Sequence, residues 1–353
     1  MPESAMMRVT FLLPLTGTSP IGGFKVVYEY ANFLASRGHQ VSVVHPAWFR
    51  KDVPLMKMKW KDAVKTTLNF RKLKKSGGWH PETWFTMRPE VRMLWVWSLE
   101  AKNIPDGDVV IATAWETAEW AAEYPAAKGR KFYLIQHHET WSGSDDRVNA
   151  TWKLPLKKIV IAGWLQDIAT EMGESAVLVH NGLDFERFRL KVPIDARDPY
   201  KVLMLFHDIE WKGSLDGLKA FLLAKEQEPK LELTLFGVVP RPADLPAEIP
   251  FYENAEQTML EKLYNGTAVF LAPSWAEGFP LPPAEAMQCG AALVATDIGG
   301  HAPYAWDGDT ALLSEVKNPE AMAKNILRIV REPGLREKIA RRGNEVIAQF
   351  TWE

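Results

Sequence analysis

The feature that most constrains the fold is a strand, loop, helix and strand at the start of the chain. Residues 9–13 form a continuous apolar run, which is typical of a fully buried strand. After a loop that contains glycines, apolar residues recur at helical spacing until Gly38, and residues 41–44 form the next apolar run. A unit of this length matches a parallel crossover, so we expect a parallel sheet covered by helices.

Buried strands recur in two series along the chain. Further apolar runs occur at residues 109–112, 132–135, 159–161 and 176–179, and again at 202–206, 231–236, 269–272 and 291–295. Between the series, Asn181-Gly182 is a turn signal and residues 185–200 show no periodicity. A length of 353 residues also suits two domains. The sequence therefore predicts two doubly wound, Rossmann-like α/β domains, residues 1–184 and 185–353.

Composition excludes several classes of protein. Lys and Arg number 42 against 44 Asp and Glu, so the net charge of −2 does not favour nucleic-acid binding. The single cysteine, Cys289, excludes a disulfide framework or a cysteine-rich zinc site. No apolar run reaches the roughly 18 residues of a membrane span, and residues 9–15 read as a strand rather than a signal peptide. We expect a cytoplasmic location, while the oligomeric state cannot be read from the sequence.

Residues 50–75 form a basic segment with two alternative interpretations. The segment has ten Lys and Arg residues against Asp52 and Asp62, with apolar residues between them. It could make a peripheral contact with an anionic membrane at the inner face, or touch a phosphorylated acceptor. Because no clean hydrophobic face can be drawn through it, a solvated insertion between strands is favoured.

An acidic motif gives the strongest chemical signal. The sequence from Glu277 to Glu285 reads Glu-Gly-Phe-Pro-Leu-Pro-Pro-Ala-Glu and directly follows a predicted strand. Pro282 and Pro283 suit the first turn of a short helix that stops at Gly290. This helix would begin at the carboxyl end of a parallel strand, where open α/β sheets bind ligands.

The first turn of that helix could bind an anion through backbone N–H groups. The candidates are the amides of Gly278, Phe279, Leu281 and Ala284. Two carboxylates beside these amides are unfavourable for a bare phosphate, but they suit a ligand that also carries hydroxyl groups, such as a sugar or ribose. The alternative for Glu285 is an acid that only stabilises the helix dipole.

The acidic motif resembles the signature of retaining glycosyltransferase family 4, a family of GT-B type. Supporting matches are Gly22-Gly23 before a helix that ends Arg37-Gly38-His39, the segment His180 to Asp184, Lys212-Gly213, and Pro273-Ser274. The segments at Gln136 and Glu210 to Gly213 are similar to bacterial polysaccharide and rhamnose-transferring members. The resemblance implies two doubly wound domains that face an interdomain cleft.

The resemblance also implies an activity and a set of donor residues. The family transfers a sugar from a nucleotide-diphosphate donor to an acceptor hydroxyl with retention, for example in synthesis of cell-surface polysaccharides or glycoconjugates, and no cofactor or metal is expected. Glu277 would contact the transferred sugar as a catalytic residue, Lys212 the diphosphate and Glu285 the nucleotide ribose. The full set of expected donor-binding residues is Gly22, Gly23, His207, Lys212, Glu277, Gly278, Phe279, Pro280, Leu281 and Glu285.

Two positions depart from the family pattern. His207 stands where relatives often have an arginine, and a histidine lacks the permanent charge of a guanidinium. This leaves a catalytically weak or inactive nucleotide-sugar-binding member as the alternative function. In the first domain, either Gln136 or His137 occupies the family's histidine position, and we assign His137 as catalytic. Gln136, His138 and Glu139 are then expected to bind a saccharide or lipid-linked acceptor.

Overall fold

The computed structural model describes residues 5–18, 20–51 and 60–352, and the chain divides into two compact units. The units are Met1–Val179 and His180–Glu353. The division lies slightly before the predicted boundary after Asp184. One reason is that the N–H of Leu183 donates to the carbonyl oxygen of Phe350 at 2.9 Å, which ties this segment to the second unit.

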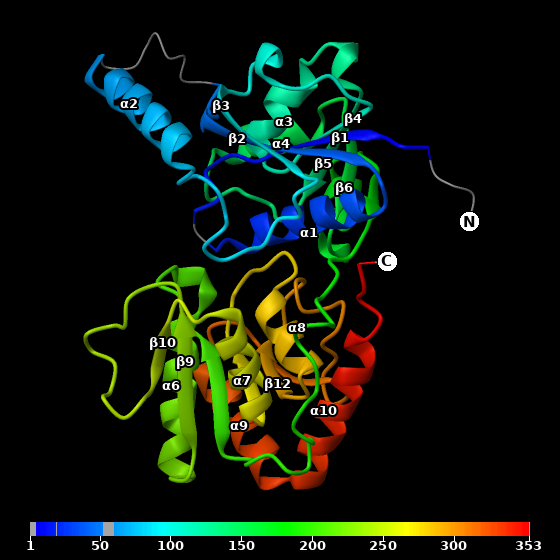
Figure 1. Ribbon diagram of the computed structural model, residues 1–353. Coiled ribbons are helices and arrows are strands. Elements are labelled where there is room, and N and C mark those ends of the chain that lie inside the picture. The colour runs from blue at the N-terminus through cyan, green and yellow to red at the C-terminus, as the bar shows by residue number, and fades with distance from the viewer. Residues whose placement is uncertain (1–4, 19, 52–59, 353) are drawn as a thin grey trace. The chain divides into compact units, whose positions relative to one another are not determined.

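The described part of the first unit contains a sheet of seven parallel strands in the order β3-β2-β1-β4-β5-β6-β7. The strands are β1 (Arg8–Leu12), β2 (Gln40–Trp48), β3 (Arg92–Ser98), β4 (Val109–Ala112), β5 (Arg130–Ile135), β6 (Lys157–Val160) and β7 (Ala176–Leu178). The α-helices are α1 (Gly22–Ser36), α2 (Trp60–Ser76), α3 (Trp115–Ala122), α4 (Asp145–Trp152) and α5 (Gly163–Glu171) (Figure 1).

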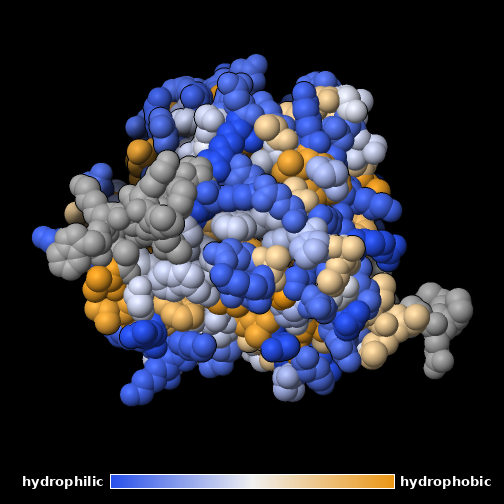
Figure 2. All heavy atoms as spheres, turned by 90° about the horizontal axis from the view of Figure 1, so that it is seen from above, coloured by the Kyte–Doolittle hydropathy of each residue, from blue (hydrophilic) through white to orange (hydrophobic). Residues whose placement is uncertain are grey.

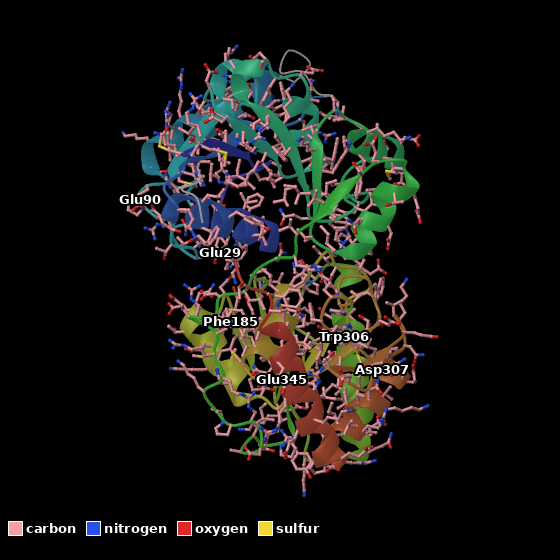
Figure 3. All side chains as sticks on the ribbon, turned by 90° about the vertical axis from the view of Figure 1, so that its right-hand side faces the viewer. Glu29, Glu90, Phe185, Trp306, Asp307 and Glu345 are labelled. Atoms are coloured by element: carbon pink, nitrogen blue, oxygen red, sulfur yellow. The ribbon has the colours of Figure 1, made fainter. Side chains whose placement is uncertain are left out.

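The described part of the second unit repeats this architecture with six parallel strands in the order β10-β9-β8-β11-β12-β13. The strands are β8 (Lys201–Leu205), β9 (Glu232–Gly237), β10 (Phe251–Glu253), β11 (Val269–Ala272), β12 (Ala292–Thr296) and β13 (Ala311–Ser314). The α-helices are α6 (Ser214–Gln227), α7 (Gln257–Gly266), α8 (Leu281–Gln288), α9 (Pro319–Arg331) and α10 (Pro333–Ile347). Figure 3 labels Phe185, on the segment that leads into this unit, and Glu345, on α10.

The predicted fold class is confirmed, and every apolar run forms a strand. The run at residues 176–179 forms the edge strand β7, and the other runs form strands inside the two sheets. In the second unit, β11 and β12 are buried along their whole length, as expected of parallel strands covered on both faces. Side chains of these strands and of α6 and α9 make up one core cluster. In both sheets the strand order reverses next to the first strand, between β1 and β4 and between β8 and β11. Such a reversal is where doubly wound sheets bind ligands.

The strand β3 and the helix α2 of the first unit were not among the predicted elements, and neither were the edge strands β10 and β13 of the second unit. The strand β3 pairs with an extended β2, in which His45 and Trp48 lie opposite Trp95 and Ser98. Much of the basic segment is the helix α2, whose Phe70 ring stacks on Trp95 at 5.8 Å. Residues 52–59 of that segment lie outside the described residues. The interpretation of residues 50–75 as a solvated insertion therefore missed a helix that packs on the edge strand.

Figure 2 shows one face of the molecule, which is mostly hydrophilic, with hydrophobic residues in separate small groups. Among the described residues, no helix combines the length and the apolar character that crossing a bilayer requires.

Candidate functional site

The loops that follow β8, β11 and β12 meet at one end of the second sheet, because these strands are adjacent and parallel. A cavity of about 30 Å³ lies there. Four predicted donor residues line it: His207, Lys212, Glu277 and Pro280. The cavity can hold one water molecule but is far smaller than a typical ligand site of roughly 300–1,000 Å³.

Lys212 and Glu277 form an ion pair that closes this site. The Lys212 Nζ atom lies 2.8 Å from each carboxylate oxygen of Glu277. The hydroxyl of Ser274 donates a third hydrogen bond to Oε1 of Glu277 at 2.9 Å. The side chains of Lys212 and Glu277 are only 27% and 14% exposed. The carboxylate and the ammonium therefore neutralise each other in partly desolvated surroundings.

The position of Lys212 depends on the glycine that follows it. Glu210–Lys212 is a short 3-10 helix, and Gly213 then takes a positive φ of 63° before α6 begins. A Cβ atom at Gly213 would lie 2.1 Å from the carbonyl oxygen of Pro273, so only glycine fits this approach of the two loops. The Trp275 N–H also donates to the carbonyl oxygen of Trp211 at 2.7 Å. Backbone contacts thus hold the loop with Lys212 against the loop with Glu277.

The helix α8 begins and ends as the sequence predicts. Pro282 and Pro283 lie in its first turn after the N-cap residue Pro280, and Gly290 takes a positive φ of 93° just beyond its end. Phe279 is buried, with its ring 5.3 Å from Tyr304. Gly278, Phe279 and Leu281 are all buried at this turn. Binding of an anion by their backbone amides remains a prediction.

Glu285 does not line the cavity beside Glu277. Its side chain is buried, and Oε2 accepts a hydrogen bond from the hydroxyl of Tyr264 at 3.0 Å. The same contact contributes to a raised pKa of the Tyr264 hydroxyl, although burial is the main cause. Contact of Glu285 with a nucleotide ribose remains a prediction.

His207 lies two residues after the end of β8, and hydrogen bonds with nearby residues hold it in place. Its N–H donates to the Ser214 hydroxyl at 2.8 Å, and its Nδ1 atom accepts from the N–H of Ile209 at 3.1 Å. Partial burial lowers the pKa of the imidazole, and the Lys212 charge lowers it further, while Asp208 acts in the opposite direction. The lowered pKa favours the neutral imidazole, and a histidine lacks the fixed positive charge that an arginine would add to the site.

Sequence reasoning missed two polar residues of the cavity. Ser274 served only as a motif match, but it fixes the Glu277 carboxylate. His301 was not considered, although it lines the same cavity and is 1% exposed. The only sequence signal for His301 is its place after Gly299-Gly300 at the end of a predicted strand, and that signal carries no chemistry by itself.

In the first unit, the structure brings Gln136 together with the start of α1. The side-chain amide of Gln136 donates to the carbonyl oxygen of Gly23 at 3.1 Å. A Cβ atom at Gly23 would lie 3.3 Å from that amide, whereas Gly22 has open space around it. The end of β5 and the first turn of α1 are thus adjacent, and β5 is one strand removed from the reversal between β1 and β4.

The two histidines after β5 have different surroundings. The ring of His137 lies edge-on to the rings of Trp141 and Trp164, with distances of 4.3 Å and 5.2 Å between ring centroids. The Nε2 atom of His138 lies 2.7 Å from Oδ1 of Asn149 on α4, a bond that holds the imidazole in place. The assignments of His137 as catalytic and of His138 as acceptor-binding remain predictions.

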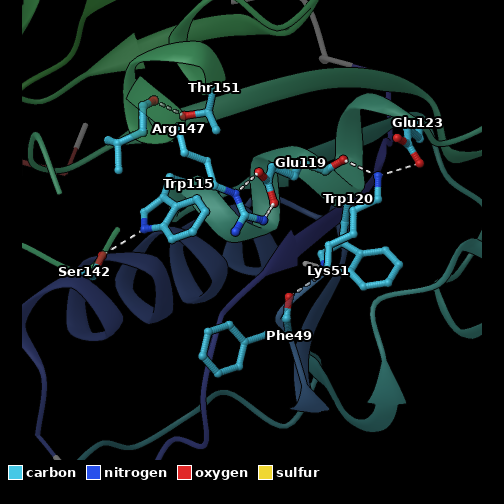
Figure 4. A network of polar contacts seen from close by, with 10 residues as sticks. Phe49, Lys51, Trp115, Glu119, Trp120, Glu123, Ser142, Arg147 and Thr151 are labelled. Carbon is cyan, nitrogen blue, oxygen red and sulfur yellow. Dashed lines mark hydrogen bonds and ion pairs between the residues drawn. The ribbon is translucent and has the colours of Figure 1, made fainter. Parts of the chain in front are cut away.

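Glu139 binds the first turn of α3. Its Oε2 atom accepts a hydrogen bond from the N–H of Trp115 at 3.0 Å. Close by, Arg147 donates to both carboxylate oxygens of Glu119 at 2.7 Å, and the Trp115 indole donates to the Ser142 hydroxyl at 2.8 Å (Figure 4). Burial raises the pKa of Glu139 to about 8, against the opposing effect of the Trp115 bond, and nearby Glu116 adds to the rise.

This raised pKa predicts that Glu139→Gln stabilises the protein increasingly as the pH rises. A carboxyl with a higher pKa in the folded state keeps a proton that the unfolded chain has lost, so the free energy of unfolding falls with pH. Between the unfolded value of 4.5 and about 8, this fall approaches about 1.4 kcal/mol per pH unit. Urea unfolding of both proteins at several pH values in this window measures the difference. An exposed control, Glu82→Gln, should show no such trend.

Two parallel α/β sheets, each with its candidate residues near the reversal of strand order, define a doubly wound protein of two units. The same fold occurs in solved structures of other proteins. One is HepE of Anabaena in complex with UDP-glucose, with a TM-score of 0.70 and 16% sequence identity over 98% of this chain and 96% of that one. At this identity the likeness shows the fold alone.

Sequence comparison gives the family. Residues 185–346 match the model of glycosyl transferases group 1. A phosphatidyl-myo-inositol mannosyltransferase of Mycolicibacterium smegmatis is 24% identical over 98% of this chain and 90% of its own length. An uncharacterized glycosyltransferase of Methanocaldococcus jannaschii is 34% identical over 83 residues. The first three curated relatives are each matched over less than a quarter of their own length. Within the second unit, the chain is therefore similar to the group 1 glycosyltransferases.

Proposed function

We propose that the protein transfers a sugar from a nucleoside-diphosphate sugar to an acceptor hydroxyl, with retention at the anomeric carbon. The observation that carries this proposal is the Lys212–Glu277 pair at the strand reversal, just before α8. The pair offers one cation for a diphosphate and one carboxylate for sugar hydroxyls. The solved complex of HepE with UDP-glucose supports a donor of this class.

Donor binding would exchange the partners of this pair. The diphosphate would take the Lys212 ammonium, and the sugar hydroxyls would take the Glu277 carboxylate. As the bond from the anomeric carbon to the diphosphate breaks, negative charge grows on the leaving group, and a fixed cation stabilises it. The acceptor oxygen would bond to the same face of the anomeric carbon, and its proton would pass to the departing phosphate.

The acceptor side of the proposal rests on the first unit. Gln136 and Gly23 lie together, and His137, His138 and Glu139 follow in the same loop. The acceptor class would be a saccharide or a lipid-linked alcohol in the synthesis of a cell-surface polysaccharide or glycoconjugate. The name of the mycobacterial relative, a phosphatidyl-myo-inositol mannosyltransferase, supports a lipid-linked acceptor.

We propose a peripheral contact of α2 with an anionic membrane as part of this function. Val64 and Leu68, one helical turn apart, are exposed, and the last turn carries Lys74 and Lys75. Sedimentation with vesicles tests the contact. Binding should require phosphatidylglycerol and should weaken in the double variant Lys74→Glu/Lys75→Glu, whereas equal binding to phosphatidylcholine vesicles would contradict it.

A catalytically weak binding protein is the second candidate, and His207 favours it. A neutral imidazole at this position leaves Lys212 as the cation that lines the described cavity. The two candidates share donor binding but differ in product formation.

A ligand screen followed by product analysis tests both. Thermal unfolding with a panel of nucleoside diphosphates and nucleotide sugars should identify a stabilising donor, because saturation at 100 times Kd adds about 2.7 kcal/mol. Release of the nucleoside diphosphate and a new glycoside with an added alcohol acceptor would establish transfer. Binding without any product would favour the second candidate, and no stabilisation by any nucleotide would reject both.

A further inference from the structure

His301 is fixed by one ring nitrogen only. It lies in the turn after β12, in the loop that continues to Trp306 and Asp307 (Figure 3). Its Nδ1 atom lies 2.8 Å from the carbonyl oxygen of Thr296. A carbonyl oxygen can only accept, so Nδ1 carries the proton and donates it. In the neutral ring, the second nitrogen therefore has a lone pair and acts as an acceptor.

The second nitrogen, Nε2, is buried and has no hydrogen-bond partner among the described residues. The side chain lines the same cavity as Glu277 and Lys212. Leaving a buried acceptor unsatisfied costs about 1–3 kcal/mol, so this atom requires a partner that the protein itself does not supply. Burial also lowers the pKa of His301, against the opposing effects of the Thr296 hydrogen bond and of the charges of Glu277 and Asp297, and so favours the neutral ring.

The chemistry of the cavity restricts that partner. A lone pair needs a hydrogen-bond donor, so a fully ionised phosphate cannot satisfy it. The cavity of about 30 Å³ has the size of one water molecule, which is also the size of one hydroxyl group. Glu277, the other acceptor in the cavity, also needs donors once Lys212 binds elsewhere. Two acceptors in a small cavity match a ligand that carries several hydroxyl groups.

The backbone brings the residues that carry the two acceptors close together. A Cβ atom at Gly300 would lie 2.5 Å from the carbonyl oxygen of Glu277 and 2.8 Å from its Cβ atom. The turn that carries His301 is therefore packed directly on the residue that carries the carboxylate. A ligand that reaches Glu277 with one hydroxyl group is therefore also close to His301.

We propose that Nε2 of His301 accepts a hydrogen bond from one hydroxyl group of the transferred sugar, which makes His301 a specificity-determining residue. This inference rests on the proposed function and deepens it. The site would discriminate against donors that lack this hydroxyl group, because such a donor leaves the buried nitrogen unpaired.

Two variants test the roles of the two ring nitrogens of His301 separately. In His301→Asn, the side-chain amide can still donate to Thr296, but it cannot reach into the cavity. In His301→Gln, the longer amide places an oxygen near the position of Nε2 and gives up the Thr296 bond. The probes are UDP-glucose and GDP-mannose, together with the analogues of each in which one hydroxyl group is replaced by fluorine. Fluorine keeps the size but cannot donate a hydrogen bond.

Calorimetry measures the Kd of each donor and each analogue for the parent protein and for both variants. In the parent protein, one analogue should bind about tenfold or more weakly than its hydroxylated donor. In His301→Asn this ratio should fall to about twofold or less, and His301→Gln should restore part of it. UDP or GDP alone should bind all three proteins equally, because the hydroxyl group that we assign to His301 belongs to the sugar. A merely structural role would weaken the nucleotide and every sugar alike.

The outcomes also separate this inference from the proposed function. If the parent transfers sugar but the same analogue is penalised equally in the parent and in His301→Asn, the inference fails and the proposed function stands. A crystal structure with a bound donor and a water molecule on Nε2 would likewise overturn the inference. If the parent binds neither nucleotide sugar nor any other in the screen, both fail.

Discussion

Glu277→Gln is expected to lower kcat/KM for sugar transfer by about 10²–10³-fold. The carboxylate accepts three hydrogen bonds in the free protein, two from Lys212 and one from Ser274. In the proposed complex, it turns to the hydroxyl groups of a sugar that gains positive charge as its glycosidic bond breaks. An amide has the same shape but no negative charge, so it cannot stabilise that charge. Initial rates with the donor found by the screen measure the loss.

The control for this variant is Glu320→Gln. Glu320 also pairs with a lysine of the second unit, Lys219, at 2.9 Å, but both side chains are about 60% exposed. Loss of a solvated pair costs little, so its rate should stay within about twofold of the parent. Parental kcat/KM in Glu277→Gln would remove Glu277 from the reacting centre, whatever happens to stability.

Arg197→Met is expected to destabilise the second unit by about 3–5 kcal/mol. Arg197 is 5% exposed, and its guanidinium donates to the carbonyl oxygens of Val192, Tyr264, Thr267 and Cys289. Tyr264 and Thr267 lie at the end of α7, and Cys289 follows α8, so one cation satisfies the ends of two helices. Methionine would fill most of the volume but would leave these oxygens buried without a donor.

Chemical denaturation followed by a probe in the second unit measures this loss of stability. Arg331→Met is the matched control, because Arg331 also donates to a carbonyl oxygen, that of Gln227, but from an exposed position. The control should change stability by less than about 1 kcal/mol. An equal effect of the two variants would show that burial does not determine the strength of the Arg197 contacts. Reduced donor affinity is also expected in Arg197→Met, since α8 begins at the site.

The sequence was sufficient for the central strands because parallel strands covered on both faces read as apolar runs. β11 and β12 are of this kind, and both lie where the runs predicted. β3 is an edge strand in which only Trp95 and Ser98 are buried, so its burial is neither continuous nor alternating along the strand. Many residues of the helix α2 are basic, and much of its surface is exposed. Its few apolar residues therefore do not form the clear hydrophobic face that predicts an amphipathic helix.

The candidate site was predictable in its residues but not in their contacts. The spacing of Glu277 and Pro282 fixed the start of α8, and a glycine after Lys212 marked the facing loop. The ion pair joins residues 65 positions apart in sequence, and only the sheet order brings them together. The bond of Glu285 to Tyr264 and the unsatisfied nitrogen of His301 are likewise tertiary facts. Both features arise from tertiary packing, which no local sequence pattern indicates.

The pairing of Lys212 with Glu277 has a consequence for competition in the cell, where free inorganic phosphate is abundant. An anion that binds the Lys212 ammonium alone leaves the partly buried Glu277 carboxylate without its cation. The free-energy cost of this unpaired charge offsets the gain from the new contact. Only a molecule that brings an anion and hydroxyl groups together replaces both halves at once. The Lys212–Glu277 pair therefore disfavours the binding of simple anions. Phosphate at millimolar concentration should leave the affinity for the donor nearly unchanged in a competition titration.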